Sequence, residues 1–74
     1  MNTEAAITVS RIKAARKGVL RALDKIRVLQ LAGHSEKVAF GLRIAADRLS
    51  DVDQILLTTQ TNAEDAGRGK PWHS

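Results

Sequence analysis

The side chains best suited to acid–base chemistry are three carboxylates in the second half of the chain and one histidine. Asp47, Asp51 and Asp53 lie close together in sequence, and on a helix Asp47 and Asp51 share one side because they are four residues apart. Such carboxylates act in acid–base catalysis or bind a divalent cation only where a pocket shifts their pKa values. A chain of two helices offers little concavity, so we interpret these aspartates as solubilising charges.

Sequence motifs for other catalysis or for metal binding are absent. The chain has no cysteine, which excludes disulfides and thiolate metal sites. His34 and His73 are too far apart for metal-ligand spacing, and neither a phosphate-binding glycine loop nor an HExxH motif occurs. We therefore predict that the protein is not an enzyme and holds no metal or cofactor. His34 follows the predicted first helix, and we expect it to interact with the carbonyl groups at the end of that helix.

A second kind of chemistry is offered by the segment RIKAARKGVLRALDKIR, residues 11–27, which holds seven Lys or Arg and one acid. On a helix, Lys13, Lys17, Arg21 and Lys25 form a row with a spacing of four residues. Such a row can follow a phosphate backbone or an acidic protein surface. The plainer interpretation is a solvated face whose bases pair with aspartates of a neighbouring helix.

The aromatic content argues against nucleic acid as the first choice of partner. Phe40 and Trp72 are the only aromatic residues, so a stacking platform for single strands is missing. Zinc-finger spacing and RNA-binding aromatic motifs are absent too, and the predicted helices are too long for a helix-turn-helix. We therefore favour an acidic protein partner and keep RNA or DNA as the alternative.

Charge and hydropathy limit the class of protein further. The 74 residues carry a net charge of +4, of which residues 1–37 contribute +5 and residues 38–74 contribute −1. No apolar run reaches the length of a membrane span, and the start MNTEAAITVS lacks the pattern of a signal peptide. We expect a cytoplasmic protein without a membrane partner.

The elements that must position these groups are helices. Proline is absent before Pro71, and LAGHSEK is the only interruption in the first sixty residues. Gly33 suits the left-handed residue after a helix end, and Ser35 suits an N-cap. We predict an all-α hairpin with helices over about 3–32 and 35–61, antiparallel because the connection is short.

Apolar residues repeat along both predicted helices with heptad spacing. In the second helix they step alternately by four and three residues, which predicts an a/d seam. This seam consists of Val38, Leu42, Ala45, Leu49, Val52, Leu56 and Thr59. In the first helix the stripe is wider and consists of Ile12, Ala15, Val19, Ala22, Ile26 and Leu29, with Leu23 beside it.

Other large apolar residues lie outside these seams and predict a second neighbour for each helix. They are Leu20, Val28 and Leu31 in the first helix and Phe40, Ile44 and Ile55 in the second. A chain this short, without disulfides or metal, is also marginal alone. We therefore predict a homodimeric four-helix bundle, although a trimer or a domain-swapped bundle also fits the heptads. The predicted core or dimer residues are Ile12, Val19, Ile26, Val38, Phe40, Leu42, Ile44, Leu49, Val52 and Leu56.

The last part of the sequence, NAEDAGRGKPWHS, is polar and has no period. We predict a hairpin domain over residues 1–61 and a flexible or frayed tail over residues 62–74. Trp72 could anchor this tail to a partner, since Trp is enriched at interface hot spots, but a disordered end is the simpler interpretation.

These observations predict a small, non-catalytic regulatory protein that docks on a larger, acidic-surfaced protein and inhibits or redirects it sterically. Its size points to a regulator carried by a phage or another mobile element. The predicted partner-binding residues are Lys13, Lys17, Leu20, Arg21, Arg27, Val28 and Leu31, an apolar centre with a charged rim. The architecture is similar to that of Rop-type plasmid regulators, helical-hairpin dimers that bind RNA hairpins. That likeness is of fold alone, and it implies the nucleic-acid alternative.

Overall fold

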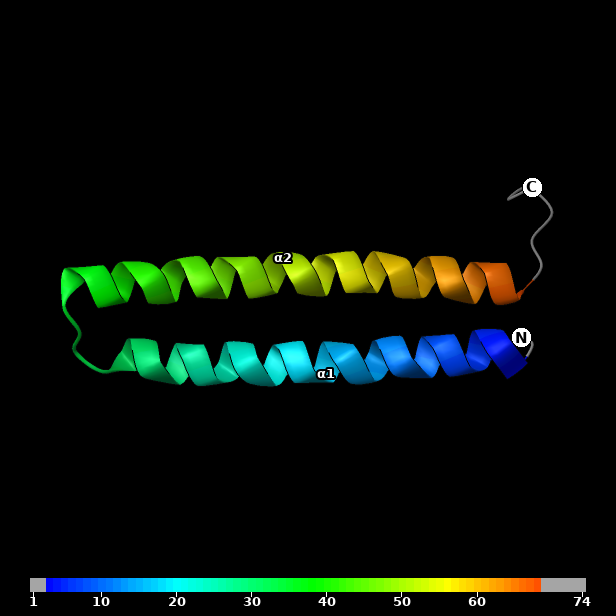
Figure 1. Ribbon diagram of the computed structural model, residues 1–74, viewed down its shortest axis with the longest axis horizontal. Helices are drawn as coiled ribbons and strands as arrows, with labels where there is room; N and C mark the ends of the chain where they lie inside the picture. Colours follow the sequence, from blue (N-terminus) through cyan, green and yellow to red (C-terminus); the bar gives the residue numbers. More distant parts are fainter. Residues whose placement is uncertain (1–2, 69–74) are drawn as a thin grey trace.

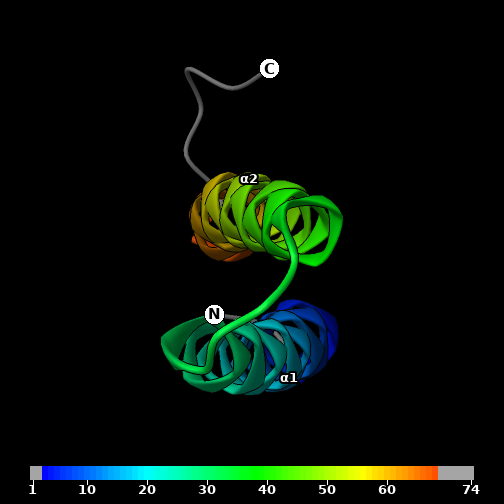
Figure 2. The same ribbon diagram turned by 90° about the vertical axis from the view of Figure 1, so that its left-hand side faces the viewer.

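The computed structural model describes residues 3–68, which form two helices joined by a short connection (Figure 1). Helix α1 spans Thr3–Leu31 and helix α2 spans Glu36–Gly67. The two helices pack against each other in opposite directions, so the predicted all-α hairpin is confirmed. Seen from the connection, their axes are inclined to each other rather than parallel (Figure 2). Trp72 and the tail interaction proposed for it lie outside the described residues.

The connection shows how each helix is ended. Ser35 is the N-cap of α2, and its hydroxyl oxygen accepts from the Val38 backbone N–H at 3.4 Å. At the end of α1, the Leu29 carbonyl accepts from the Ala32 N–H at 3.2 Å and from the His34 ring Nε2–H at 2.6 Å. The expected interaction of His34 with a carbonyl of the first helix is therefore confirmed. The expectation of a left-handed Gly33 is wrong, because α1 is ended by these two bonds without a positive φ there.

Helix α2 is longer than the sequence pattern indicated. It continues past residue 61 to Gly67, and the Arg68 N–H then donates to the carbonyls of Glu64 at 3.1 Å and Asp65 at 3.2 Å. The expected tail is thus corrected for residues 62–67, which are helical. The reason is that Ala63, Glu64 and Ala66 favour a helix even though apolar periodicity has ended. Residues 69–74 of that expected tail lie outside the described residues.

Only a narrow core is closed between the two helices. Val9 and Leu23 are each 5% exposed and Gln60 is 9% exposed, and they are the buried residues of the described chain. The half-buried residues around them are Ala5, Ile12, Arg16, Val19, Ala22 and Ile26 in α1, and Leu42, Ala45, Ala46, Leu49, Asp53, Leu56, Ala63, Glu64, Asp65 and Gly67 in α2. Of the predicted core, Ile12, Val19, Ile26, Leu42, Leu49 and Leu56 lie in this contact.

At two positions of α2 the helix contact uses the residue that follows the predicted one. Val38 and Val52, expected in the seam, are 47% and 41% exposed, and Thr59 is also exposed. Asp53 and Gln60 occupy the contact instead. In α1 the contact contains Val9, Arg16 and Leu23. Of the predicted stripe, Ala15 and Leu29 are exposed, and Ala22 stays half-buried. The predicted and the observed helix contacts share two rows, Ile12–Val19–Ile26 in α1 and Leu42–Leu49–Leu56 in α2.

Candidate binding surfaces

A polar cluster stands in the middle of the helix contact and explains the shifted seam. Arg16 donates from Nε to Asp53 Oδ1 at 3.0 Å and from Nη1 to Gln60 Oε1 at 3.3 Å. Gln60 in turn donates from Nε2 to Glu64 Oε1 at 3.3 Å. The side chains of Arg16 and Asp53 are only 24% and 14% exposed. Their charges tolerate this burial because each has a partner.

Neighbouring bases of α1 are left without acidic partners. Within the described chain, Lys13, Lys17, Arg21 and Arg27 make no ion pair, whereas Arg16 does. The plainer interpretation of the basic segment thus holds for Arg16, which pairs with an aspartate of the neighbouring helix. It does not hold for the other six bases of the segment, none of which makes an ion pair within the described residues.

Aliphatic side chains interrupt these free bases. Leu20, Val28 and Leu31 are 41%, 66% and 87% exposed. Their spacing places them on the same side of α1 as the four bases, turned away from the row that contains Ala15 and Ala22. We call this set the basic face, which consists of Lys13, Lys17, Leu20, Arg21, Arg27, Val28 and Leu31. It contains all the residues predicted to bind a partner.

The basic face borders a shallow hollow where the two helices meet. Lys13, Arg16, Lys17, Leu20 and Gln60 line this open space of about 290 Å³. Arg16 and Gln60, which share a hydrogen bond, are the less exposed residues of this lining, whereas the two lysines and Leu20 are exposed. A partner could therefore insert a side chain between α1 and α2 while contacting the basic face.

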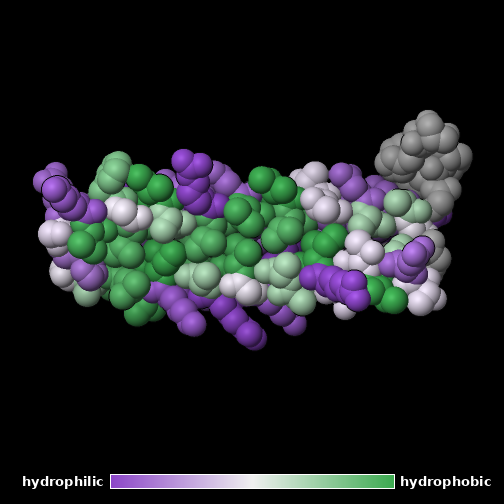
Figure 3. Space-filling view, viewed as in Figure 1, coloured by the Kyte–Doolittle hydropathy of each residue, from purple (hydrophilic) through white to green (hydrophobic). Residues whose placement is uncertain are grey.

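The opposite face of the hairpin is apolar. Figure 3 shows apolar side chains in a continuous band over both helices, mainly in the part of the molecule nearer to the connection. An antiparallel pair is related by a twofold axis perpendicular to its plane, so equivalent positions on the two helices lie on the same face. Ala15 and Val52 are equivalent, because each directly precedes a member of the polar cluster. We call the set Ala15, Ala22, Leu29, Val38, Ala45 and Val52 the apolar face.

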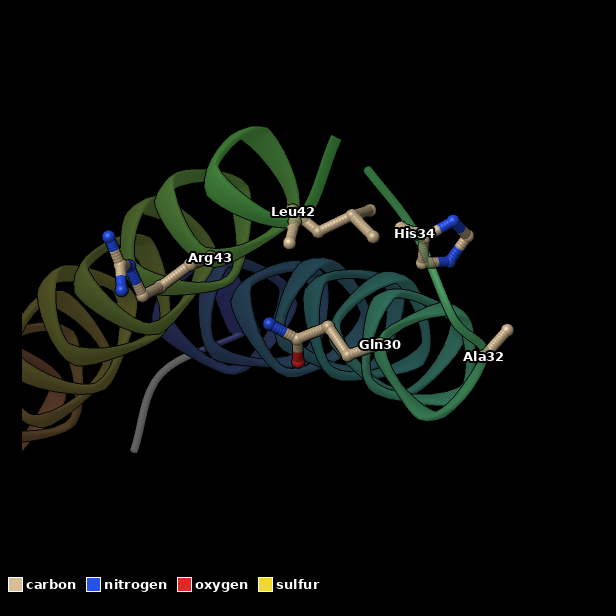
Figure 4. A pocket seen from close by; sticks show the side chains of 6 residues that line it. Gln30, Ala32, His34, Leu42 and Arg43 are labelled. Atoms are coloured by element: carbon tan, nitrogen blue, oxygen red, sulfur yellow. The ribbon is translucent and has the colours of Figure 1, made fainter. Parts of the chain in front are cut away.

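A small pocket beside the connection holds the only histidine of the described residues (Figure 4). It has a volume of about 270 Å³ and is lined by Gln30, Ala32, His34, Ala39, Leu42 and Arg43. No carboxylate or nucleophile lines it, and the His34 Nε2 is engaged by the Leu29 carbonyl. The geometry gives this pocket no acid–base pair of the kind that catalysis requires.

The carboxylates singled out in the sequence are dispersed. Asp53 is bound in the polar cluster, and Asp47 and Asp51 are exposed on α2. Among residues 3–68, no group of three His, Cys, Asp or Glu side chains gathers as metal ligands. Nor does either helix, as far as it is described, have an apolar stretch that could cross a membrane.

Two participants in the helix contact were not found from the sequence. Val9, Arg16 and Leu23 are spaced seven residues apart. Because Arg16 is charged, apolar periodicity did not assign this row to the helix contact. Gln60 is polar and follows the end of clear apolar periodicity. The sequence did contain one indication of this contact. Arg16, Asp53 and Gln60 can hydrogen-bond with one another, and Asp53 and Gln60 are seven residues apart, which is the spacing of a contact seam.

Comparison with known proteins gives no further guide. No protein-family model matches the chain, and no curated protein and no solved structure match it.

Proposed function

We propose that this protein is a non-catalytic binding module that works as a homodimeric four-helix bundle. Its basic face docks on an acidic surface of a larger protein and sterically inhibits or redirects that protein. The observation that carries this proposal is the exposure of Leu20, Val28 and Leu31 among bases that have no acidic partner in the described chain. An apolar centre with a charged rim is the composition of a protein-binding patch.

The same observation favours protein over nucleic acid. Phosphates would satisfy Lys13, Lys17 and Arg21 but would leave the aliphatic side chains uncovered, and Leu31 is the most exposed large apolar residue of the hairpin. The aromatic ring of the described residues, Phe40, lies on α2 with the Arg43 guanidinium 5.4 Å from its centre. It does not extend the basic face into a base-stacking platform.

Steric action is the mechanism that such a module can offer. The hairpin is an extended rod with overall dimensions of 53 × 20 × 12 Å, so it can cover a long groove or a helix of its partner. A regulator of a phage or another mobile element fits this small size. Cytoplasmic location is part of the proposal and is supported by the absence of cysteine, since the fold needs no oxidising compartment.

The test is capture of partners from a lysate of the source cell, with and without nuclease, by the tagged protein and matched variants. Leu31→Asp and Lys17→Glu change the basic face, and Lys37→Glu places the same charge reversal at the start of α2. We expect a discrete protein partner that survives nuclease and moderate salt, is retained by Lys37→Glu and is lost with Leu31→Asp. The mass of the dimer should remain unchanged in all three variants.

The opposite pattern would replace the proposal. A signal that disappears with nuclease, falls steeply with salt and is abolished by charge reversal at Lys13, Lys17 and Arg21 would establish nucleic-acid binding. If Leu31→Asp and Lys17→Glu each capture the protein partner as strongly as wild type does, the basic face is not the docking surface.

A further inference from the structure

We propose that the apolar face receives a second copy of this chain, and that the two hairpins pair with their connections at the same end of the bundle. This inference rests on the homodimer of the proposed function and adds its geometry. In this arrangement each α1 lies against the partner's α2, and both basic faces remain on the outside.

The distribution of residues between the two seams identifies the apolar face as an interface. The rows used only inside the hairpin are Val9, Arg16 and Leu23 in α1 and Ala46, Asp53 and Gln60 in α2. Half of their members are polar. The six residues of the apolar face are all apolar, although Thr8 and Thr59 continue their rows away from the connection. Ala15, Leu29, Val38 and Val52 are exposed, and Ala22 and Ala45 are half-buried at the edge of the helix contact. The heptad pattern is therefore better satisfied by an external neighbour than by the helix contact that the single chain makes.

The hairpin alone leaves too much apolar surface in water. It buries only Val9 and Leu23 among its apolar side chains, while eleven large apolar residues are exposed. Of these eleven, Leu29, Val38 and Val52 belong to the apolar face, whereas Leu20, Val28 and Leu31 belong to the basic face. The continuous apolar band that Figure 3 shows marks an interaction site on a small protein. Cores this small are normally completed by disulfides, a metal or a second subunit, and the chain has no cysteine for the first. The second copy supplies an identical apolar face of matching length.

Two twofold arrangements would bring the apolar faces together. In one, the axis runs along the helices, the connections lie at the same end, and each α1 contacts the partner's α2. In the other, the axis runs across the helices, the connections lie at opposite ends, and each helix contacts its own copy. The two arrangements bury the same face, so charge and position decide between them.

Charge favours contact between unlike helices. The residues of α1 carry seven bases and two acids, a net charge of +5, whereas those of α2 carry three bases and six acids, a net charge of −3. Contact of α1 with its own copy would bring two strongly basic helices together. Contact of α1 with the partner's α2 replaces this repulsion by attraction.

The borders of the apolar face carry charged residues on both helices. Lys25 lies one helical turn from both Ala22 and Leu29, and Asp51 lies one turn from Ile55 beside Val52. Both charges are exposed and make no ion pair within the described chain. With the connections at the same end, the side of α1 that carries Lys25 runs along the side of the partner's α2 that carries Asp51. Arg48, one turn from both Ala45 and Val52, adds a base to that side of α2, so the preference rests on the net charges of the two helices.

The position of the apolar face along the rod supports the same arrangement. Its rows cover residues 15–29 of α1 and 38–52 of α2, the halves next to the connection, and Figure 3 shows the apolar band displaced toward that end. Connections at the same end superpose these two halves over their full length. With the connections at opposite ends, the apolar half of each hairpin would lie against the polar half of the other. Only an offset along the rod would bring the apolar halves together, and it would shorten the overlap of the two hairpins.

The first experiment measures mass by light scattering over a range of protein concentrations. Wild type should be a dimer, and Val52→Asp should raise the dissociation constant at least about 100-fold because it places a charge in the interface. Leu31→Asp, the same type of change on the basic face, should leave the dimer intact. A monomer for wild type would overturn this inference together with the proposed homodimer. Equal dissociation constants for the two variants would remove the apolar face from the interface.

The second experiment measures the arrangement in a chain with no change in the core. Because the natural chain has no cysteine, Thr3→Cys carries a single spin label, and electron–electron dipolar spectroscopy gives the distance between the two labels. Connections at the same end predict about 30 Å or less, and connections at opposite ends predict about 40 Å or more, from the rise per residue and the spacing of packed helices. The longer distance in a dimer would overturn the arrangement and leave the homodimer standing.

Discussion

Arg16 and Asp53 form a 3.0 Å ion pair inside the helix contact, while Val52, the residue just before Asp53, is 41% exposed. A rule that places apolar residues inside would choose Val52 for this position. The structure instead uses the polar residue within the hairpin and leaves the valine on the apolar face. The ion pair thus fixes which side of α2 faces α1, in the way that a buried polar residue sets register in helical bundles.

We expect Asp53→Ala to destabilise the protein by about 1–3 kcal/mol, because it leaves the half-buried Arg16 guanidinium without its carboxylate. Arg16→Leu combined with Asp53→Leu should restore most of this loss, since apolar side chains then fill the seam. Urea unfolding of wild type, Arg16→Leu, Asp53→Leu and the double variant at one protein concentration forms a double-mutant cycle that measures the coupling. Additive losses would mean that the pair contributes no specific energy.

Leu23→Ala should be the most damaging truncation in the hairpin. Leu23 is 5% exposed, so its removal opens a cavity and should cost about 2–5 kcal/mol. Leu31→Ala serves as the matched control, because Leu31 is 87% exposed and should change the free energy of unfolding by less than about 0.5 kcal/mol. Thermal unfolding followed by circular dichroism compares the two. Similar losses at both positions would contradict the described helix contact.

Ser35→Ala should destabilise α2 by about 0.5–2 kcal/mol through loss of the N-cap bond to the Val38 N–H. Ser35→Asp should retain most of the stability, because its carboxylate can accept the same bond next to the positive helix end. Amide hydrogen exchange of the first turn of α2 reads this effect locally. Unchanged protection in Ser35→Ala would show that the cap contributes nothing.

The helices and their connection follow from the sequence because they depend on local chemistry. Ser35 caps a helix whatever packs beside it, and the basic side of α1 needs only helical spacing to be recognised. The face of α2 that contacts α1 is a tertiary choice. Val52 and Asp53 are adjacent, and the choice between them depends on Arg16 and Gln60 from distant parts of the chain.

The unpaired state of the basic face also depends on tertiary structure. Spacing alone could not separate Arg16, which pairs with Asp53, from Lys13 and Lys17, which find no carboxylate within the described residues. The end of α2 was placed too early for a related reason. Apolar periodicity reports burial, whereas the helix continues to Gly67 through residues that favour helix without being strongly apolar.

Gly18→Ala should stabilise the protein by up to about 1 kcal/mol, since glycine is costly inside a helix and alanine is not. A methyl group at this position would meet nothing within 4 Å in the described chain, so the replacement introduces no clash within the hairpin. The midpoint of urea unfolding measures the gain. A destabilised variant would show that another helix approaches Gly18 more closely than a methyl group allows, and would place this edge of α1 in the dimer contact.

The last turns of α2 should contribute to stability although they are largely polar. A chain ending at Thr61 loses Ala63 and Glu64, which are half-buried beside the start of α1, and Glu64 also accepts from Gln60. We expect this chain to unfold at lower urea than one ending at Arg68, and to lose amide protection in the first turns of α1 as well. Equal stability of the two chains would mean that residues 62–67 fold as a helix without supporting the hairpin. Loss of protection confined to α2 would point to the same conclusion, because a packed neighbour would have loosened with it.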